Sequence, residues 1–216
     1  MNRSLALVIG NRNYSSWSLR AWLAMKHSGL PFEEIFIPLD MPDSKAKIAE
    51  HSPSNLVPIL KVGDDTVWES LAIIDVLAEL APGVKFWPDD FSARAMARSI
   101  SAQMHAGFFR LRRDMPMDLR SDLSGREKTE AALGDAAKIT ALWASCREQF
   151  GQTGPYLFGD WSAADMMYAP VVGRFRSFGV ATNAACETYM DAVLAHPDMA
   201  QWMADAINEP YVLRNP

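Results

Sequence analysis

The stretch LALVIGNRNYSSWSLRAWLAMKHSGLPFEEIFIPL, residues 5–39, contains three elements whose order restricts the fold. Residues 5–9 form an apolar run of strand length, and residues 32–39 predict a second strand. Between them, residues 17–26 carry apolar side chains at helical spacing, and a glycine and a proline follow as a stop signal. A strand, a helix and a strand in this order predict two parallel strands joined by a right-handed crossover.

The segment after this unit predicts a hairpin and another helix. A short helix is expected at residues 44–50, and VPILKVGDDTVWES predicts two short strands joined by a turn at Gly63. Residues 69–80 form a helix in this interpretation, because apolar side chains recur at positions 71, 74, 77 and 80. The sequence APGVKFWPDD then breaks the pattern with two prolines and a glycine, which is typical of a linker between domains.

Strand signals almost vanish in the second half of the chain. Helical spacing predicts helices at residues 92–113, 126–150 and 163–175, with shorter pieces near 187–194 and 198–207. The fold class is therefore α/β followed by all-α. We expect an α/β domain at residues 1–81, a linker at 82–90 and an all-α domain at 91–216.

Composition excludes several classes of function. The chain has 216 residues, of which 49% are apolar and 22% are charged, as in a soluble globular protein. Its net charge of −5 gives no electrostatic basis for binding nucleic acid or an anionic membrane. No apolar run is long enough to span a bilayer, and the first residues lead into a strand, not a signal peptide.

The cysteines and histidines do not form a pattern that binds a metal ion. Cys146 and Cys186 are far apart in the sequence, and the four histidines form no HExxH pair. We interpret the two cysteines as ordinary thiols of a cytoplasmic protein and expect no metal site.

The segment SPSNLVPIL, residues 52–60, has a proline at the entrance of a predicted strand. Pro58 is tolerated there because the first strand residue need not donate a ladder hydrogen bond. Alternatively, a cis bond between Val57 and Pro58 turns the Val57 backbone toward a ligand, although only about 5% of such bonds are cis. Asn55 is a candidate for a left-handed conformation in the preceding turn.

Glu69 and Ser70 open the next predicted helix, and two interpretations of this pair are open. An acidic and a hydroxyl residue are favoured at any helix N-terminus by its dipole and its free amides. A helix N-terminus with a serine hydroxyl also binds a carboxylate, and an adjacent glutamate pairs with an ammonium group. Together the two residues suit an α-amino acid, which carries both charges on one carbon.

Three serines, Ser15, Ser16 and Ser18, stand at the start of the first predicted helix. A single N-cap needs only one hydroxyl. Two interpretations are therefore open: either the serines serve only as helix caps, or one hydroxyl takes part in chemistry.

These features together resemble the glutathione S-transferase family over essentially the whole chain. A further match is GDWSAADMMYAP, residues 159–170, which is similar to the family's capping box, with Ser162 and Asp165 bonded across the first helical turn. The serine segment is most similar to the zeta-like, serine-type branch, in which a cysteine stands at the position of Trp17. An isomerase acting on maleylacetoacetate is known in that branch, and Trp17 is a departure from its motif.

The resemblance implies a thioredoxin-like N-terminal domain followed by a helical-bundle C-terminal domain, in a cytoplasmic homodimer. It implies glutathione as co-substrate, no metal, and activation of the glutathione thiol as a thiolate. The thiolate then conjugates with, or assists the isomerisation of, a small electrophile. In this fold the cis form of the bond before Pro58 becomes the expected one.

The family's glutathione contacts carry over residue by residue. Ser15 matches the first serine of the branch's pair and is assigned to the thiolate, Ser16 is the second choice, and the Tyr14 phenol is a weaker alternative. The remaining implied glutathione contacts are Trp17, Lys45, Val57, Pro58, Glu69 and Ser70. Among these, the Val57 backbone pairs with the cysteinyl part and Glu69 and Ser70 hold the γ-glutamyl end. Lys45 either reaches the glycyl carboxylate or is a solvated lysine.

The electrophile is expected between the domains, against the helix predicted at residues 92–113. The candidates for this second-substrate site are Tyr14, His105, Phe108, Phe109 and Arg112. An aromatic pair and a single histidine are more often structural than functional. If an arginine faces the cleft, an acidic or carbonyl-bearing electrophile is favoured.

One serine hydroxyl is sufficient to ionise the thiol. Lowering a thiol pKa of about 8.5 by about two units requires roughly 2.7 kcal/mol. A hydrogen bond to a charged group supplies roughly 1.5–3 kcal/mol, and a helix N-terminus adds roughly 0.3–1 kcal/mol.

The alternative function is a non-catalytic, transferase-like binding protein. A thiol-disulfide reductase of this fold would require a nucleophilic cysteine in the opening motif, and the motif has none.

Overall fold

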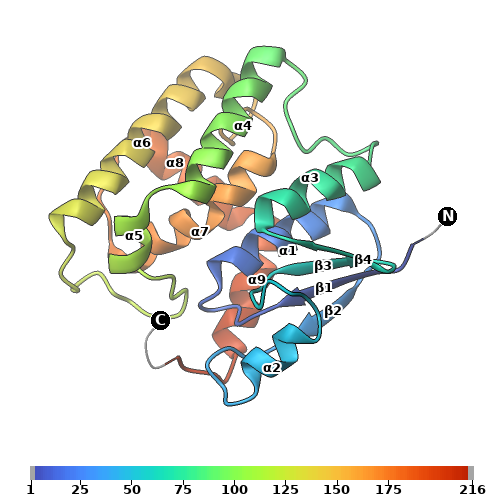
Figure 1. Cartoon of the computed structure of the whole chain (residues 1–216). Coiled ribbons are helices and arrows are strands. Elements are labelled where there is room, and N and C mark those ends of the chain that lie inside the picture. The colour runs from blue at the N-terminus through green and yellow to red at the C-terminus, as the bar shows by residue number, and fades with distance from the viewer. Residues whose placement is uncertain (1–2, 214–216) are drawn as a thin grey trace.

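The structure, a computed structural model, describes residues 3–213. A small mixed sheet with helices on both faces lies beside a bundle of helices, and the chain passes from the first part to the second (Figure 1). The elements of the first part are β1 (Leu5–Ile9), α1 (Ser16–Ser28), β2 (Glu33–Phe36), α2 (Ser44–Ala49), β3 (Ile59–Val62), β4 (Asp65–Trp68) and α3 (Ser70–Leu80).

The sheet has four strands in the order β2-β1-β3-β4. Strands β1 and β2 are parallel and joined through α1, which confirms the strand-helix-strand prediction. Strand β3 is antiparallel to β1 and forms a hairpin with β4, as the glycine turn predicted. This arrangement is the thioredoxin-like sheet expected for the first half of the chain.

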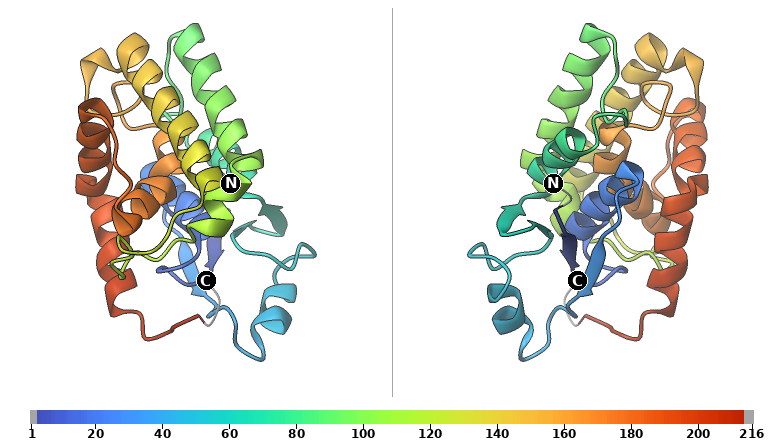
Figure 2. Two further views of the ribbon diagram at one scale, coloured as in Figure 1. Left: turned by 90° about the vertical axis from the view of Figure 1, so that its left-hand side faces the viewer. Right: turned by 90° about the vertical axis from the view of Figure 1, so that its right-hand side faces the viewer.

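Alternation along β1 divides the apolar side chains between two cores. Leu7 and Ile9 belong to the main core beneath α1 and α3. Val8 points to the opposite face and packs with Ile48 of α2 and Ile59. Figures 1 and 2 show α2 on one side of the sheet and α1 and α3 on the other.

The second part is helical, and in the described residues no strand follows β4. Its α-helices are α4 (Phe91–Ala106), α5 (Phe109–Asp114), α6 (Glu130–Phe150), α7 (Ala163–Phe178), α8 (Ala184–Ala195) and α9 (Pro197–Asn208). The α/β plus all-α prediction is therefore confirmed. Helix α3 ends at Leu80 and α4 begins at Phe91, and the domain boundary at residues 82–90 stays a prediction.

The single helix predicted at residues 92–113 is wrong, because it is broken between α4 and α5. Gly107 ends α4, and its amide donates to the Gln103 carbonyl at 2.8 Å. A side chain at Gly107 would meet that carbonyl oxygen at 2.8 Å. Phe108 then has φ of 57°, a left-handed conformation that no helix interior accepts. The break turns α5 to a new direction and sets the position of Arg112.

Helix α6 begins at Glu130, four residues later than the predicted start at residue 126. Thr129 is its N-cap, since the Thr129 hydroxyl accepts from the amide of Ala132 at 3.1 Å. The predicted capping box of α7 is present. Asp165 Oδ2 accepts from the Ser162 amide at 2.9 Å and from the Ser162 hydroxyl at 2.8 Å.

Helix α1 lies between the sheet and α7 and joins the two parts of the molecule. Arg20 of α1 is fully buried there, and its Nε donates to the carbonyl of Met167 in α7 at 3.0 Å. Arg20 therefore has a structural role at the contact between α1 and α7. The N-terminus of α1 consequently faces the helical part, beside Arg112 and Arg174.

Candidate functional site

Two adjoining pockets lie at the N-termini of α1 and α3. The larger, about 370 Å³, is lined by residues of both parts of the molecule, among them Ser15, Ser16 and Arg174. The smaller, about 200 Å³, is lined by Pro58, Glu69 and Ser70 among others. Both pockets share the residues Trp17, Leu56 and Val57. The two serines and the Glu69–Ser70 pair, more than fifty residues apart in the sequence, therefore face neighbouring spaces.

Ser15 and Ser16 occupy different positions at the start of α1. Ser15 is the N-cap, and its Oγ accepts from the amide of Ser18 at 3.3 Å and lies 2.8 Å from Ser18 Oγ. Ser16 is the first helical residue, and its Oγ accepts from Arg174 Nη2 at 3.2 Å. Both hydroxyls line the larger pocket at the positive end of the helix dipole. This is an environment that stabilises an anion.

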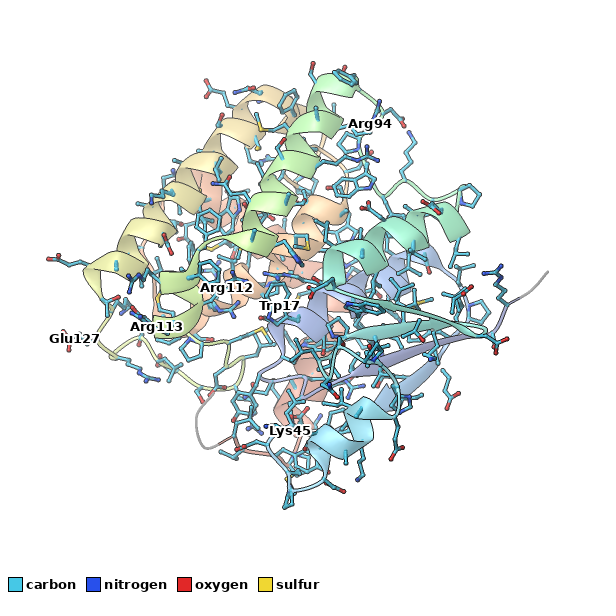
Figure 3. The ribbon with its side chains drawn as sticks, viewed as in Figure 1. Trp17, Lys45, Arg94, Arg112, Arg113 and Glu127 are labelled. Atoms are coloured by element: carbon cyan, nitrogen blue, oxygen red, sulfur yellow. The ribbon has the colours of Figure 1, made fainter. Side chains whose placement is uncertain are left out.

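Trp17 lies between the two pockets. Its indole is contacted by the guanidinium carbon of Arg20, 4.5 Å from the ring centroid, and by that of Arg112 at 5.1 Å. The His105 ring packs edge-on at 5.3 Å. Figure 3 shows Trp17 near the centre of the molecule with Arg112 beside it, whereas Arg113 lies farther away in the view. The indole thus holds Arg112 against the larger pocket by cation–π contact.

Arg112 and Arg174 line the larger pocket, and with the buried Arg20 they form a positive cluster. Within residues 3–213 none of them has a carboxylate within 4.0 Å. Burial, aided by Arg112, lowers the pKa of Arg174 to about 9. Burial and the two neighbouring arginines also lower the pKa of Arg20, whose Nη1 and Nη2 have no partner in the described structure. Clustered positive charge at a pocket favours an anionic ligand.

Arg174 is a pocket residue that the sequence interpretation missed. Its Nε donates to the carbonyl of Met115 at 2.9 Å, and its Nη1 to that of Pro170 at 3.3 Å, so the guanidinium is fixed in place. A sequence signal existed, because Arg174 interrupts the apolar run after Pro170 in α7.

The bond between Val57 and Pro58 is cis, as expected, and Asn55 has φ of 56°, the expected left-handed conformation. Val57 lines both pockets. The amide and carbonyl of Val57 take no part in the hydrogen bonds described for residues 3–213. The backbone of Val57 is therefore available to pair with an extended ligand.

Ser70 begins α3 and is fully buried, and its hydroxyl has no hydrogen-bond partner among the described residues. Glu69 precedes it with φ of 69°, an uncommon conformation for a residue other than glycine. Glu69 Oε2 lies 3.3 Å from His105 Nε2 of the helical part. Burial lowers the pKa of His105, although Glu69 acts in the opposite direction. A neutral His105 leaves the Glu69 charge available for a cation.

The other predicted site residues lie at varied distances from these pockets. Tyr14 and Arg112 line the larger pocket, and the Tyr14 hydroxyl accepts from Arg120 Nη2 at 3.0 Å. Phe108 is part of the core, and Phe109 is 70% exposed, so the structure brings neither to the pockets. Lys45, labelled in Figure 3, is an exposed residue of α2 and lines a groove that shares Leu39 with the larger pocket.

Among the described residues, no group of three or more histidine, cysteine, aspartate or glutamate side chains is placed to hold a metal ion. Over the same part of the chain, no helix combines the length and the apolar character needed to cross a membrane.

Comparison with known proteins agrees with this fold. Residues 14–80 match the family model described as glutathione S-transferase, N-terminal domain. A protein of Caenorhabditis elegans named "Probable maleylacetoacetate isomerase" is 30% identical over 204 residues, which cover 87% of this chain and 90% of that protein. Maleylacetoacetate isomerase of Rattus norvegicus is 31% identical over 176 residues, covering 78% and 77%.

A solved structure extends the similarity to three dimensions. A glutathione transferase homologue from Burkholderia, solved with bound glutathione, superimposes with a TM-score of 0.72 at 25% identity. The match covers 96% of this chain and all of that one. A thioredoxin-like domain followed by a helical domain, with the larger pocket at their junction, defines a glutathione transferase type of protein. The chain belongs to the glutathione S-transferase family, and it is an enzyme of that family.

Proposed function

We propose that the chain binds glutathione across the two pockets and holds its sulfur as a thiolate at the N-terminus of α1. The thiolate is used for conjugation to a small electrophile or for its isomerisation. The observation that carries the proposal is the placement of two serine hydroxyls and Arg174 at one pocket, which adjoins the pocket of Glu69 and Ser70.

The γ-glutamyl end of glutathione fits the smaller pocket. Its carboxylate accepts from the Ser70 hydroxyl and from the free amides at the start of α3, where the helix dipole is favourable. Its ammonium group pairs with the Glu69 carboxylate. The cysteinyl part then pairs with the backbone of Val57, and its sulfur reaches the larger pocket at Ser15 and Ser16.

The thiolate is stabilised mainly by a serine hydroxyl. We assign Ser15 as the first donor, because it stands at the N-cap, and Ser16 as the second, with Arg174 bonded to its oxygen. A hydrogen bond to a charged sulfur is worth roughly 1.5–3 kcal/mol, and the nearby positive charge of Arg174 acts in the same direction. These contributions account for a thiol ionised at neutral pH.

The electrophile carries a carboxylate or a polarised carbonyl in this proposal. Arg112 and Arg174 line the larger pocket, and among the described residues neither has a carboxylate within 4.0 Å. Maleylacetoacetate, the substrate in the names of the relatives, is an acid with conjugated carbonyl groups. Isomerisation of such an acid is therefore one of the reactions that the site supports, although Trp17 replaces the branch's cysteine.

A non-catalytic binding protein is the less favoured alternative, because it would not require two serine hydroxyls and an arginine at the position of the sulfur. The roles of Lys45 at the glycyl carboxylate and of a homodimer stay predictions.

Calorimetry with glutathione and the ultraviolet absorbance of the bound thiolate against pH test the proposal. We expect glutathione to bind, and we expect the midpoint of the thiolate absorbance curve to lie below the free thiol's pKa of about 8.5. Ser15→Ala should shift the curve to higher pH and leave the dissociation constant nearly unchanged, because the hydrogen bond is stronger to the thiolate than to the thiol. A shift in Ser16→Ala alone would transfer the role to Ser16. If neither curve moves, the serine assignment is refuted.

A further inference from the structure

Ser18 is a third hydroxyl beneath the larger pocket, and it lies outside the pocket itself. It is fully buried, and its Oγ accepts from the backbone amide of Gly10 at 3.0 Å. The same oxygen lies 2.8 Å from Ser15 Oγ. The capping of α1 requires only the Ser18 amide, which Ser15 Oγ accepts at 3.3 Å. The hydroxyl of Ser18 is therefore not explained by helix capping.

The two hydroxyls of this pair differ in the hydrogen bonds that their protons make. Ser15 donates its proton to Ser18 Oγ, and Ser18 Oγ also accepts from Gly10. In the described structure the Ser18 proton has no acceptor. The pair thus holds two protons and makes one hydroxyl–hydroxyl bond. That bond is equally available in the opposite direction, with Ser18 as the donor.

We propose that Ser18 is a positioning residue for the thiolate and acts through Ser15. When a thiolate enters the pocket, the Ser15 proton turns onto the sulfur, and the Ser18 hydroxyl replaces it by donating to Ser15 Oγ. No covalent bond changes, and both hydroxyls rotate about their C–O bonds. The result is a chain of hydrogen bonds that runs from the Gly10 amide through Ser18 and Ser15 to the sulfur.

The direction of the chain follows from its fixed end. The Gly10 amide is a backbone group that only donates, so Ser18 Oγ always accepts there. Ser18 is then free to give its single proton to Ser15, and each donor in such a chain polarises the next. Reversal removes no bond from the pair and adds one to the thiolate. Ser15 therefore donates to the sulfur without leaving its own oxygen short of a donor.

Ser16 provides a contrast within the same pocket. Its oxygen accepts from the charged Arg174, so Ser16 is polarised by a guanidinium without a hydroxyl relay. Removal of the Ser18 hydroxyl should therefore affect only the part of the stabilisation that passes through Ser15. This separation makes the inference testable by a double-mutant cycle.

The inference rests on the proposed role of Ser15, and the experiment measures the two together. Bound-thiolate absorbance is recorded against pH in the full chain with saturating glutathione, for wild type, Ser18→Ala, Ser15→Ala and the double variant. We expect Ser18→Ala to lower the thiolate fraction at neutral pH roughly two- to fourfold, a part of the Ser15→Ala effect. The dissociation constant of glutathione should change less than about twofold, because the neutral thiol gains little from the chain. The double variant should match Ser15→Ala.

Three outcomes overturn the inference. In the first, Ser15→Ala shifts the thiolate curve and Ser18→Ala leaves it at the wild-type position. In the second, Ser18→Ala shifts the curve equally with and without Ser15. If neither single variant shifts the curve, the role of Ser15 has failed and the relay fails with it.

A second pair of variants keeps the test decisive if Ser18→Ala does not fold. Ser18→Cys preserves the shape with a weaker donor and should shift the curve in the same direction as Ser18→Ala. Ser18→Thr keeps the hydroxyl and should restore the wild-type curve. A wild-type curve in folded Ser18→Cys refutes the relay.

Discussion

Replacing Ser70 by alanine should have different effects on glutathione binding and on the stability of the protein without ligand. The Ser70 hydroxyl is buried and has no partner among the described residues. With glutathione bound, we expect it to donate to the γ-glutamyl carboxylate. The same substitution therefore should weaken binding and should not weaken the fold, a combination that a merely structural serine would not produce.

The magnitude for binding follows from the charge of the acceptor. A hydrogen bond from a hydroxyl to a carboxylate is worth roughly 1.5–3 kcal/mol. At about 1.4 kcal/mol for each factor of ten, the dissociation constant of glutathione should rise roughly 10- to 150-fold in Ser70→Ala. Burial of an unpaired hydroxyl costs roughly 1–3 kcal/mol. The variant without ligand should therefore be at least as stable as the wild type.

Calorimetry gives the first quantity, and urea unfolding without glutathione gives the second. The dipeptide cysteinylglycine, which lacks the γ-glutamyl carboxylate, should bind wild type and variant equally. Ser99→Ala is the matched control, since Ser99 is an exposed helical serine far from both pockets whose hydroxyl donates within α4. Unchanged glutathione affinity in Ser70→Ala, or a clear loss of stability in the free variant, would refute the assignment.

Three further outcomes follow from the described contacts. Arg112→Leu should lower kcat/KM for a carboxylate-bearing electrophile roughly 10-fold or more and should not change it for a neutral electrophile. Arg113 is on the same helix but not at the pocket, so Arg113→Leu should affect neither electrophile. Equal losses on both electrophiles in Arg112→Leu would contradict a site for an anionic electrophile. Glu209→Ala should lower the free energy of unfolding in urea by roughly 1–3 kcal/mol, because the Asn11 side-chain amide and the Arg12 backbone amide both donate to this buried carboxylate at 2.6 Å. Asp205 is more exposed and serves as the control, and a loss of stability in Glu209→Ala no larger than that in Asp205→Ala would contradict this prediction. Burial raises the pKa of Asp165 from 3.8 to about 6, so the folded chain binds this proton more tightly than the unfolded chain. The resulting stabilisation is fully present below pH ~4 and should be lost as the pH rises through ~6. This stabilisation amounts to roughly 3 kcal/mol, at 1.36 kcal/mol per pKa unit. The free energy of unfolding of Asp165→Asn in urea should not show this pH dependence, and parallel pH profiles of the wild type and the variant would disprove the pKa shift.

Local patterns in the sequence were sufficient for most of the fold. The strands, the turn at Gly63 and most helices depend on side-chain periodicity and on stop signals a few residues away, so they were predicted close to their observed bounds. The helix between residues 92 and 113 failed for a tertiary reason. The chain adopts a left-handed conformation at Phe108, whose side chain is buried in the core, and the periodicity of the sequence does not record that packing.

The candidate site shows the same division between near and distant contacts. The serines at the start of α1, the Glu69–Ser70 pair and the cis bond before Pro58 were identified from short motifs, because helix caps and X-Pro bonds are local features of the chain. Which of these residues share a pocket was decided only by the packing of α1 against α7.

That packing brings Arg174 to Ser16 across 158 positions of sequence and buries Arg20 against Met167. Phe109 is 70% exposed and lines neither pocket, and Lys45 of α2 lines a groove that shares Leu39 with the larger pocket. Hydrogen bonds between neighbours in the chain form in any context that permits the helix or turn, so the sequence determined them by itself. Contacts between distant residues depend on the angle and register at which whole elements pack, and only the tertiary structure decided those.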